Sequence, residues 1–296
     1  MEILYNVAGI SRQGFHAGRH TTPRQMKRTG DSEVLQMVLD IRKNHLPGSS
    51  AREVYHYIRN KAPQYDARLI GWGKHAFEAL CFRNCLKIEV KRFVPKTTIK
   101  GAYTFENLIE GMEIRDINRV WVSDICYLYT MDGKLVGYAT TLIDLYSRRL
   151  LGLAFSQTMH AYVTSTPVIQ QAFEERKIAR FDNLIFHSDA GKQYIESNFL
   201  AAIRSKNIES SMADSCYENP FAEAFNDILK NHILPDLNIN SFAQLKKNEP
   251  FIKYCYNYNR RHNNSHKMTP HDFEQHILTL QHGQRTKLKI KVISKQ

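Results

Sequence analysis

The chain contains little cysteine, and the cysteines that it has are not arranged in pairs. Five cysteines are scattered over 296 residues, and no two of them form a CxxC pattern. Cys81 and Cys85 are four residues apart and could share one helix face, but no second pair completes a zinc site. We therefore expect reduced, buried thiols in a cytoplasm, without a zinc site and without dependence on disulfides.

Long apolar runs, low-complexity tracts and internal repeats are also missing. No stretch of 18 apolar residues could span a bilayer, and the first thirty residues carry arginine and histidine where a secretory signal would be apolar. The composition, 43% hydrophobic and 24% charged, is that of an ordinary globular protein of about two domains. The sequence therefore predicts a chain that is neither secreted nor inserted in a membrane.

The chain has fewer acidic than basic residues. Lys and Arg number 41 against 29 Asp and Glu, a net charge of +12. Residues 1–100 hold 18 basic and 8 acidic residues, and residues 281–296 hold five basic residues and no acid, so the middle is near neutral. Basic ends favour a polyanionic partner, and acids kept in the middle would suit a central metal site. Charge that serves solubility alone is the alternative.

The first hundred residues are expected to be mainly helical. Residues 7–16 resemble the turn and second helix of a helix-turn-helix, and we interpret residues 1–30 as a partial copy of that motif. Apolar residues at helical spacing predict three short helices within residues 31–90. Their basic faces suggest a small DNA-binding bundle, with a simple packing domain as the alternative. Residues 91–117 are expected to form a basic linker.

From residue 118 the pattern changes from helices to strands. β-Branched and aromatic residues predict an antiparallel meander, and helix and strand patterns then alternate. The expected strands are 120–129, 135–145, 150–155, 183–187 and 208–212, and the expected helices are 164–176 and 197–205. This order is that of the ribonuclease-H-like α/β fold. We assign residues 118–245 to this core and residues 246–296 to a C-terminal helical segment with a basic tail.

Three acids stand where such a core could bring them together. Asp124 lies within the first strand, where a carboxylate is costly unless it is paired or bound to a metal. Asp189 follows the strand at 183–187, and sites assemble at strand ends in α/β sheets. Glu223 lies on a helix that is expected to begin at Pro220. The alternatives are that Asp124 lies on a solvated strand face, that Asp189 caps a turn and that Glu223 lies on a solvated helix face.

The helix that carries Glu223 also carries Asn226 and Lys230 on the same face, at positions i, i+3 and i+7. The carboxylate could reach a metal ion, and the ammonium of Lys230 could reach a phosphate two turns away. Cleavage and transfer of a phosphodiester with two Mg²⁺ ions needs converging carboxylates. One ion activates the nucleophile and the other stabilises the leaving oxygen.

Several blocks of the sequence, in the same order, resemble those of one family. They are WVSDI at 121–125, IDLYSR at 143–148, HSDAGKQY at 187–194, YENPFAE at 217–223 with Lys230, YNYNRRH at 256–262 and MTP at 268–270. These blocks resemble the retroviral-integrase-like transposases, above all the second-frame (orfB-type) products of bacterial insertion sequences. The resemblance covers residues 5–275.

The resemblance implies a DDE-type transposase that cuts element ends to expose 3′-hydroxyls and joins them to target DNA. Asp124, Asp189 and Glu223 would be its catalytic residues and the ligands of two Mg²⁺ ions, for which Mn²⁺ could substitute. Lys230 would contact the DNA of the element end. The interval between Asp189 and Glu223, 33 residues, is shorter than is usual in the family.

Arg260 and Arg261 follow an aromatic run and suggest a phosphate-contacting helix end, with an ordinary basic surface as the alternative. The expected partners are double-stranded DNA, further copies of the chain on that DNA, and an upstream-frame DNA-binding product or fusion. The expected location is the bacterial cytoplasm, in association with the nucleoid. Two other functions stay open: a decayed copy that only binds DNA, and a nuclease of the same fold that does not join.

Overall fold

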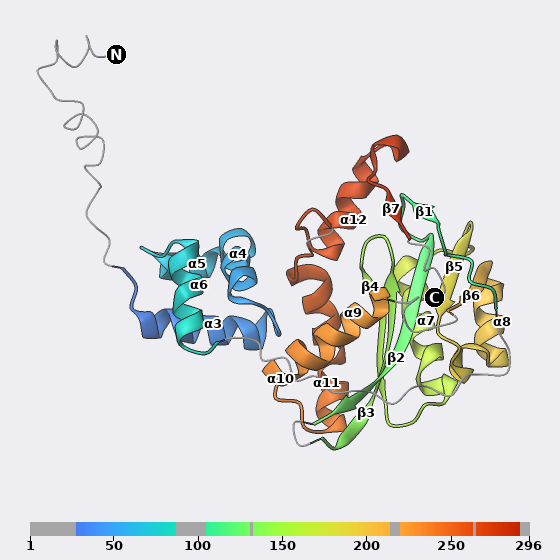
Figure 1. The fold of residues 1–296 in the computed structure, drawn as a ribbon, viewed down its shortest axis with the longest axis horizontal. Coiled ribbons are helices and arrows are strands. Elements are labelled where there is room, and N and C mark those ends of the chain that lie inside the picture. The colour runs from blue at the N-terminus through green and yellow to red at the C-terminus, as the bar shows by residue number, and fades with distance from the viewer. Residues whose placement is uncertain (1–27, 87–104, 131–132, 214–219, 263–264, 291–296) are drawn as a thin grey trace, which may run out of the picture.

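The computed structural model describes residues 28–86, 105–130, 133–213, 220–262 and 265–290. These residues form an all-helical region, an α/β core and C-terminal helices that pack on the core (Figure 1). The expected partial helix-turn-helix, up to residue 27, and residues 91–104 of the expected linker lie outside the described residues. None of the described helices is long and apolar enough to cross a membrane.

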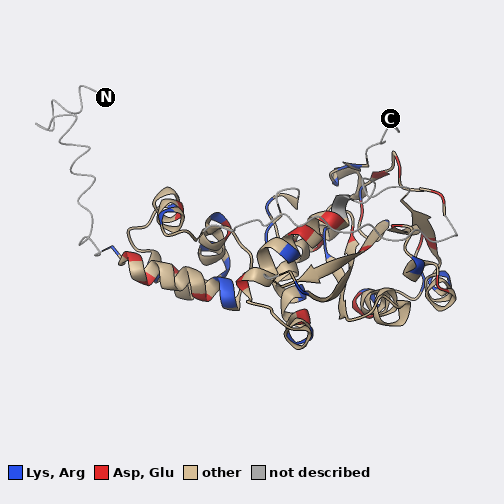
Figure 2. Ribbon diagram, turned by 60° about the horizontal axis from the view of Figure 1, so that its bottom comes forward, with Lys and Arg blue, Asp and Glu red and all other residues tan. Residues whose placement is uncertain are grey.

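The helical region folds around its own apolar core. Its elements are α3 (Asp31–Asn44), α4 (Ala51–Lys61), α5 (Pro63–Asp66), the short helix η1 (Ala67–Leu69) and α6 (Lys74–Arg83). Ser50 begins α4 with a reciprocal cap, because its hydroxyl accepts from the Glu53 amide and its own amide donates to the Glu53 carboxylate. Acids at the start of α3 and bases at its end match the helix dipole (Figure 2).

The last helix of this region is shorter than the sequence predicts. Apolar residues recur at helical spacing from residue 69 to residue 86, which predicts the third of the three helices there, but α6 begins only at Lys74. Gly71 has a φ of +76°, a left-handed conformation that an α-helix cannot continue through. The neighbouring Trp72 donates from its indole nitrogen to the carbonyl of Thr29 at 2.9 Å, so the turn is also held by a long-range contact.

The core contains one five-stranded mixed sheet. Its strands are β2 (Val120–Tyr129), β3 (Leu135–Asp144), β4 (Leu150–Ser156), β5 (Leu184–Ser188) and β6 (Ile208–Met212). Their order across the sheet is β4-β3-β2-β5-β6. In this sheet β3 pairs antiparallel with both β2 and β4, whereas β5 pairs in parallel with both β2 and β6. The predicted ribonuclease-H-like order is confirmed.

Helices cover both faces of the sheet (Figure 1). One face packs against α7 (Ser165–Arg176) and α8 (Ser197–Ser205), and the other against α9 (Pro220–Ile228) and α11 (Phe242–Tyr254). Along β2, Trp121 joins the core under α7 and α8, whereas Val122 and Cys126 join the core under α9. Because side chains alternate along a strand, Asp124 lies on the α9 face of the sheet.

The C-terminal residues are integral to the core. The boundary expected after residue 245 falls inside α11, which packs on β4. Helix α12 (Pro270–Thr279) is anchored by Glu274, which forms buried ion pairs with Arg149 at 3.2 Å and Arg176 at 2.6 Å. Strand β7 (Leu288–Lys289), in the expected basic tail, pairs with β1 (Glu113–Ile114).

Candidate active site

Asp124 and Asp189 lie close together because β2 and β5 are parallel neighbours. Val122 pairs with His187, so two residues farther along each segment Asp124 stands beside Asp189. Adjacent strands are about 4.8 Å apart, which puts the two carboxylates within strong electrostatic reach of each other. Both residues are partly buried.

The carboxyl group of Asp124 is strongly perturbed by its surroundings. Burial, then the negative charge of Asp189 and then that of Glu223 raise its pKa to about 7. Asn226 opposes this rise, because its side-chain nitrogen donates to Asp124 Oδ2 at 2.7 Å. Carboxylates that repel one another in this way are stabilised in their charged form by a bound cation.

Asn226 brings a second polar atom to the site. The residue is 2% exposed, and its side-chain oxygen is buried with no hydrogen-bond partner among the described residues. A buried acceptor without a donor costs free energy. An amide oxygen is also a ligand that a hard divalent cation, or a water bound to it, accepts.

Helix α9 presents Glu223 and leads to Lys230. Ala222 and Phe225 bury the apolar side of the helix, and Glu223 lies on the exposed side. Burial raises the pKa of Glu223 and the charge of Lys230 lowers it, so these two side chains are electrostatic neighbours. Lys230 stands in the π-helical turn η5 (Leu229–Ile233) rather than on the continuous α-helix that the sequence predicts. Such wide turns often occur at functional sites.

The turn after Asp189 depends on a glycine. The amide of Gly191 donates to Asp189 Oδ1 at 3.2 Å. A Cβ at position 191 would lie 3.0 Å from that oxygen and 2.9 Å from Oε1 of Gln193. A side chain at position 191 would therefore displace Gln193 or the catalytic candidate itself. The short helix η3 (Lys192–Tyr194) follows directly.

Tyr194 closes the site on the side of α7 and α8. Its hydroxyl lies 2.9 Å from Ser123 Oγ, which itself donates to the carbonyl of Thr141 at 2.7 Å, so the tyrosine is the donor to the serine. Burial, then the charges of Asp189 and Asp124, raise the pKa of Tyr194 well above its usual value. The phenol is therefore a fixed neutral donor that ties η3 to the strand of Asp124.

His187 is a packed histidine. It is fully buried, and its Nδ1 lies 2.9 Å from Ser211 Oγ, on the neighbouring strand β6. Ser211 Oγ also accepts from the amide of Leu108 at 2.9 Å. The structure therefore supports a packing role for His187 between β5 and β6.

The donor atoms suit a magnesium ion, although the described side chains do not form a closed site. No group of three His, Cys, Asp or Glu side chains within the described ranges is spaced to hold a metal ion. The chemistry nevertheless fits, because the charges of Asp189 and Glu223 both act on Asp124, and Asn226 adds a buried oxygen without a partner among the described residues. All of these are the hard oxygen ligands that Mg²⁺ prefers.

Arg260 and Arg261 lie in different settings. Arg260 donates to the carbonyl of Gly48 at 3.1 Å and lies 3.6 Å from Glu53, and its side chain is 11% exposed. It is therefore engaged in joining the helical region to the core. Arg261 is partly exposed and donates to the carbonyl of Lys267. The proposed DNA contact of both arginines stays a prediction.

Asn226 and Tyr194 had no role in the site that the sequence predicted. Asn226 was placed on one helix face with Glu223, and its i+3 spacing was the available signal. Tyr194 ends the block at 187–194, but nothing in the sequence indicated its bond to Ser123. Both roles depend on contacts between segments far apart in the chain.

Comparison with known proteins agrees with this geometry. The model of the family described as Integrase core domain matches residues 115–216. The transposase InsF for insertion sequence IS3A of Escherichia coli (strain K12) is 32% identical over 178 residues, which cover 59% of this chain and 60% of InsF. An uncharacterized 31 kDa protein of insertion element IS600 from Shigella sonnei is 28% identical over 278 residues, 92% of this chain and 97% of that protein.

A solved structure gives a weaker match. The HTLV-2 integrase catalytic core domain in complex with magnesium superposes with a TM-score of 0.42 and 16% identity, covering 54% of this chain and 97% of that one. The sheet order and the family match define the class: the chain has an integrase core on a ribonuclease-H-like sheet. More particularly, the chain is similar to the InsF insertion-sequence transposases and to the IS600 protein, which confirms the resemblance that the sequence blocks indicated. The chain spans 60–62% of the length of the InsF proteins that it matches.

Proposed function

We propose that the chain is a DDE-type DNA transposase whose catalytic acids are Asp124, Asp189 and Glu223. The observation that carries the proposal is the parallel register of β2 and β5, which sets the two aspartates side by side under the helix that bears Glu223. The similarity to the transposase InsF supports the same reaction class.

The reaction consists of two in-line displacements at phosphorus. In the first, water attacks a phosphodiester at the element end, and the bond to the 3′ oxygen breaks to release a 3′-hydroxyl. In the second, that hydroxyl attacks a target phosphodiester, and one P–O bond forms as another breaks. No covalent bond to the protein is required. Bound Mg²⁺ or Mn²⁺ ions supply activation of the attacking oxygen and stabilise charge on the leaving oxygen.

The side chains hold and orient the reacting groups. Asp124, Asp189 and Glu223 provide the carboxylates for the ions, and Asn226 fixes the orientation of Asp124 through its 2.7 Å hydrogen bond. Lys230, the electrostatic neighbour of Glu223, binds a phosphate of the element end. The partner is double-stranded DNA, which the net charge of +12 favours, and several copies of the chain hold two ends together.

A joining assay with pre-cut DNA ends tests the catalytic acids. Asp124→Asn, Asp189→Asn and Glu223→Gln should each lower joining at least about a hundredfold in Mg²⁺, because each removes a charged ligand while leaving the shape of the site. Binding of the same DNA should be retained. A fully active Glu223→Gln variant would refute the assignment of the third acid. Cutting without joining would indicate a nuclease, and binding alone a decayed copy.

Thermal unfolding tests the ions independently of DNA. Mg²⁺ should raise the melting temperature of the wild type, since a ligand that binds only the folded state stabilises it. Asp124→Asn should melt at a higher temperature than the wild type in a chelator, because it removes like-charge repulsion, and should not respond to Mg²⁺. Asn226→Leu should retain folding but lose about tenfold or more in joining, as expected for a positioning residue. An equal Mg²⁺ response of wild type and Asp124→Asn would contradict the ion assignment.

A further inference from the structure

The segment between β4 and α7 presents two aromatic rings to solvent. Tyr162 is 71% exposed, the largest exposed fraction among the large hydrophobic side chains of the described residues, and His160 is exposed as well. Their rings are stacked, with centroids 5.6 Å apart and planes 14° apart. An exposed aromatic face gains nothing from the fold itself, because it stays in contact with water.

The backbone beneath the two rings is firmly held. The carbonyl of His160 accepts from the amide of Val163 at 3.1 Å and from the hydroxyl of Thr164 at 2.8 Å. Ala161, between the rings, is buried. The backbone that carries the two rings is therefore fixed before any ligand binds, which lowers the entropy cost of stacking on them.

Two contacts tie this segment to the parts of the chain that carry the aspartates. Ser165 Oγ donates to the carbonyl of Gln193 at 2.8 Å, in the turn that follows Asp189. On the other side, the hydroxyl of Tyr127, three residues after Asp124 on β2, contacts the sulfur of Met159 at 3.7 Å. The ring pair is thus tied to both segments that carry the aspartates.

A positive charge stands on the short helix that neighbours the ring segment. Lys192 is exposed on η3, which packs directly against the short helix η2 (Ala161–Val163). An aromatic face with an adjacent cation is the combination that binds unpaired nucleotides, since the ring stacks a base and the cation contacts the backbone phosphate. Inside a paired duplex the base faces are covered by their neighbours, so only an unpaired base can use such a surface.

We infer that Tyr162, backed by His160, stacks an unpaired base of the DNA strand whose phosphodiester lies at the aspartates. The inference rests on the proposed transposase function and deepens it. Tyr162 positions the opened strand for reaction, and Lys192 holds the phosphate beside that base. The surface discriminates an unpaired DNA end from a blunt one.

The test compares a blunt duplex with a duplex of the same sequence that has unpaired nucleotides at one end, one of them 2-aminopurine. The full-length wild type should bind the unpaired end more tightly and quench its fluorescence. Tyr162→Ala should weaken that binding about tenfold, about 1.4 kcal/mol, and abolish the quenching, with blunt-duplex binding unchanged. Tyr162→Phe should restore both, because it keeps the ring.

Tyr254→Ala is the matched control. Tyr254 is also an exposed, stacked tyrosine, but it lies at the end of α11 beside Tyr57 of the helical region. It should leave the preference for unpaired ends intact. If Tyr162→Ala keeps the preference and the quenching while the wild type still binds and joins DNA, the inference is wrong and the proposed function stands. If the wild type neither binds nor joins DNA, both are wrong.

Discussion

His262 is held neutral by its surroundings. Burial first, and then the positive charges of Arg260 and Arg148, lower its pKa to about 3. The ring packs edge-on against Tyr256 with centroids 4.8 Å apart, and its Nε2 is buried without a hydrogen-bond partner in the described part of the chain. Protonation in the folded state would place a third positive charge beside two arginines.

The free energy of unfolding should therefore fall as the pH drops below about 6.5. An unfolded histidine titrates near pH 6.5, whereas folded His262 titrates near 3, so between these values the unfolded state binds more protons. At about pH 5 the loss from this residue is at most about 2 kcal/mol. Urea unfolding at about pH 7.5 and at about pH 5 measures it.

His262→Asn isolates this contribution, because all other titrating groups are common to both proteins. The variant should lose less stability between the two pH values than the wild type does. Equal losses in the two proteins would show that His262 titrates normally in the folded state.

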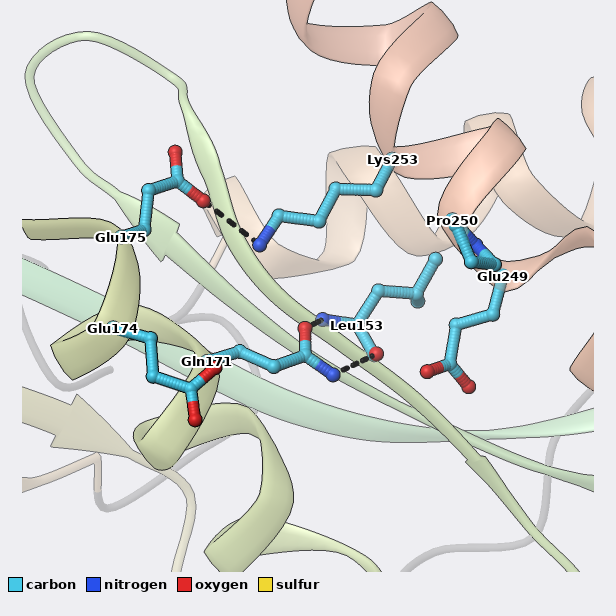
Figure 3. A pocket seen from close by; sticks show the side chains of 7 residues that line it. All are labelled: Leu153, Gln171, Glu174, Glu175, Glu249, Pro250 and Lys253. Atoms are coloured by element: carbon cyan, nitrogen blue, oxygen red, sulfur yellow. Dashed lines mark hydrogen bonds and ion pairs between the residues drawn. The ribbon is translucent and has the colours of Figure 1, made fainter.

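At the scale of elements, β4 is an edge strand whose outer backbone groups form hydrogen bonds with side chains. The amide group of Gln171 accepts from the Leu153 nitrogen at 3.0 Å and donates to the Leu153 carbonyl at 2.9 Å (Figure 3). Asn257 makes the same pair of bonds to Leu150, both at 2.9 Å. An open edge would be a template for pairing with another chain, and these amides remove it.

A cavity of about 370 Å³ lies beside this edge, between α7 and α11. Its lining residues are Leu153, Gln171, Glu174, Glu175, Glu249, Pro250 and Lys253 (Figure 3). Lys253 pairs with Glu175 at 2.8 Å, and Glu249 accepts from the amide of Phe155 at 3.1 Å. The polar groups of the cavity thus bond to the backbone at the strand edge and join the two helices by an ion pair.

Gln171→Leu should destabilise the protein by about 1–3 kcal/mol, because it leaves a backbone donor and acceptor of Leu153 unsatisfied. It should also increase self-association, since the edge becomes available for pairing. Urea unfolding and light scattering measure the two effects. Gln170→Leu, the same substitution at the exposed neighbouring position, should change neither. Similar results for both variants would contradict the edge-closing role.

At the scale of the whole molecule, the helical region is docked on the C-terminal half of the chain. The amide of Gly48 donates to Asp236 at 2.8 Å, and Lys61 pairs with Asp272 at 2.6 Å. Gly48 has a φ of +69°, and a Cβ there would lie 2.6 Å from the carbonyl carbon of His232. His232 belongs to η5, the same turn as Lys230. The docking of the helical region is therefore connected to the position of the lysine that neighbours Glu223.

Arg260→Ala should loosen this docking. The substitution removes the hydrogen bond to the Gly48 carbonyl and leaves Glu53 without its cross-domain charge partner. The radius of gyration in solution scattering should increase, and proteolysis between the helical region and the core should accelerate several-fold. Arg261→Ala is the neighbouring control, because Arg261 donates to the Lys267 carbonyl in its own segment, and its charge repels a protonated His56 of the helical region rather than attracting that region. An unchanged radius of gyration for Arg260→Ala would contradict a docking role.

The amino-acid sequence by itself determined the order and type of the core elements. The three strands of the meander, the following strands at 184–188 and 208–212 and the helix from Pro220 were all predicted, since their periodicity and turn residues are local properties of the chain. The candidate acids could be named for the same reason, because each stands at a recognisable place in a strand, a strand end or a helix.

Tertiary structure alone decided how these elements meet. The register that sets Asp124 beside Asp189, the bond from Asn226, the bond from Ser165 to the turn after Asp189 and the engagement of Arg260 with Gly48 all join segments distant in sequence. The same holds for the pairing of β7 with β1 and for the late start of α6. Such contacts depend on packing summed over the whole core, which no local pattern encodes.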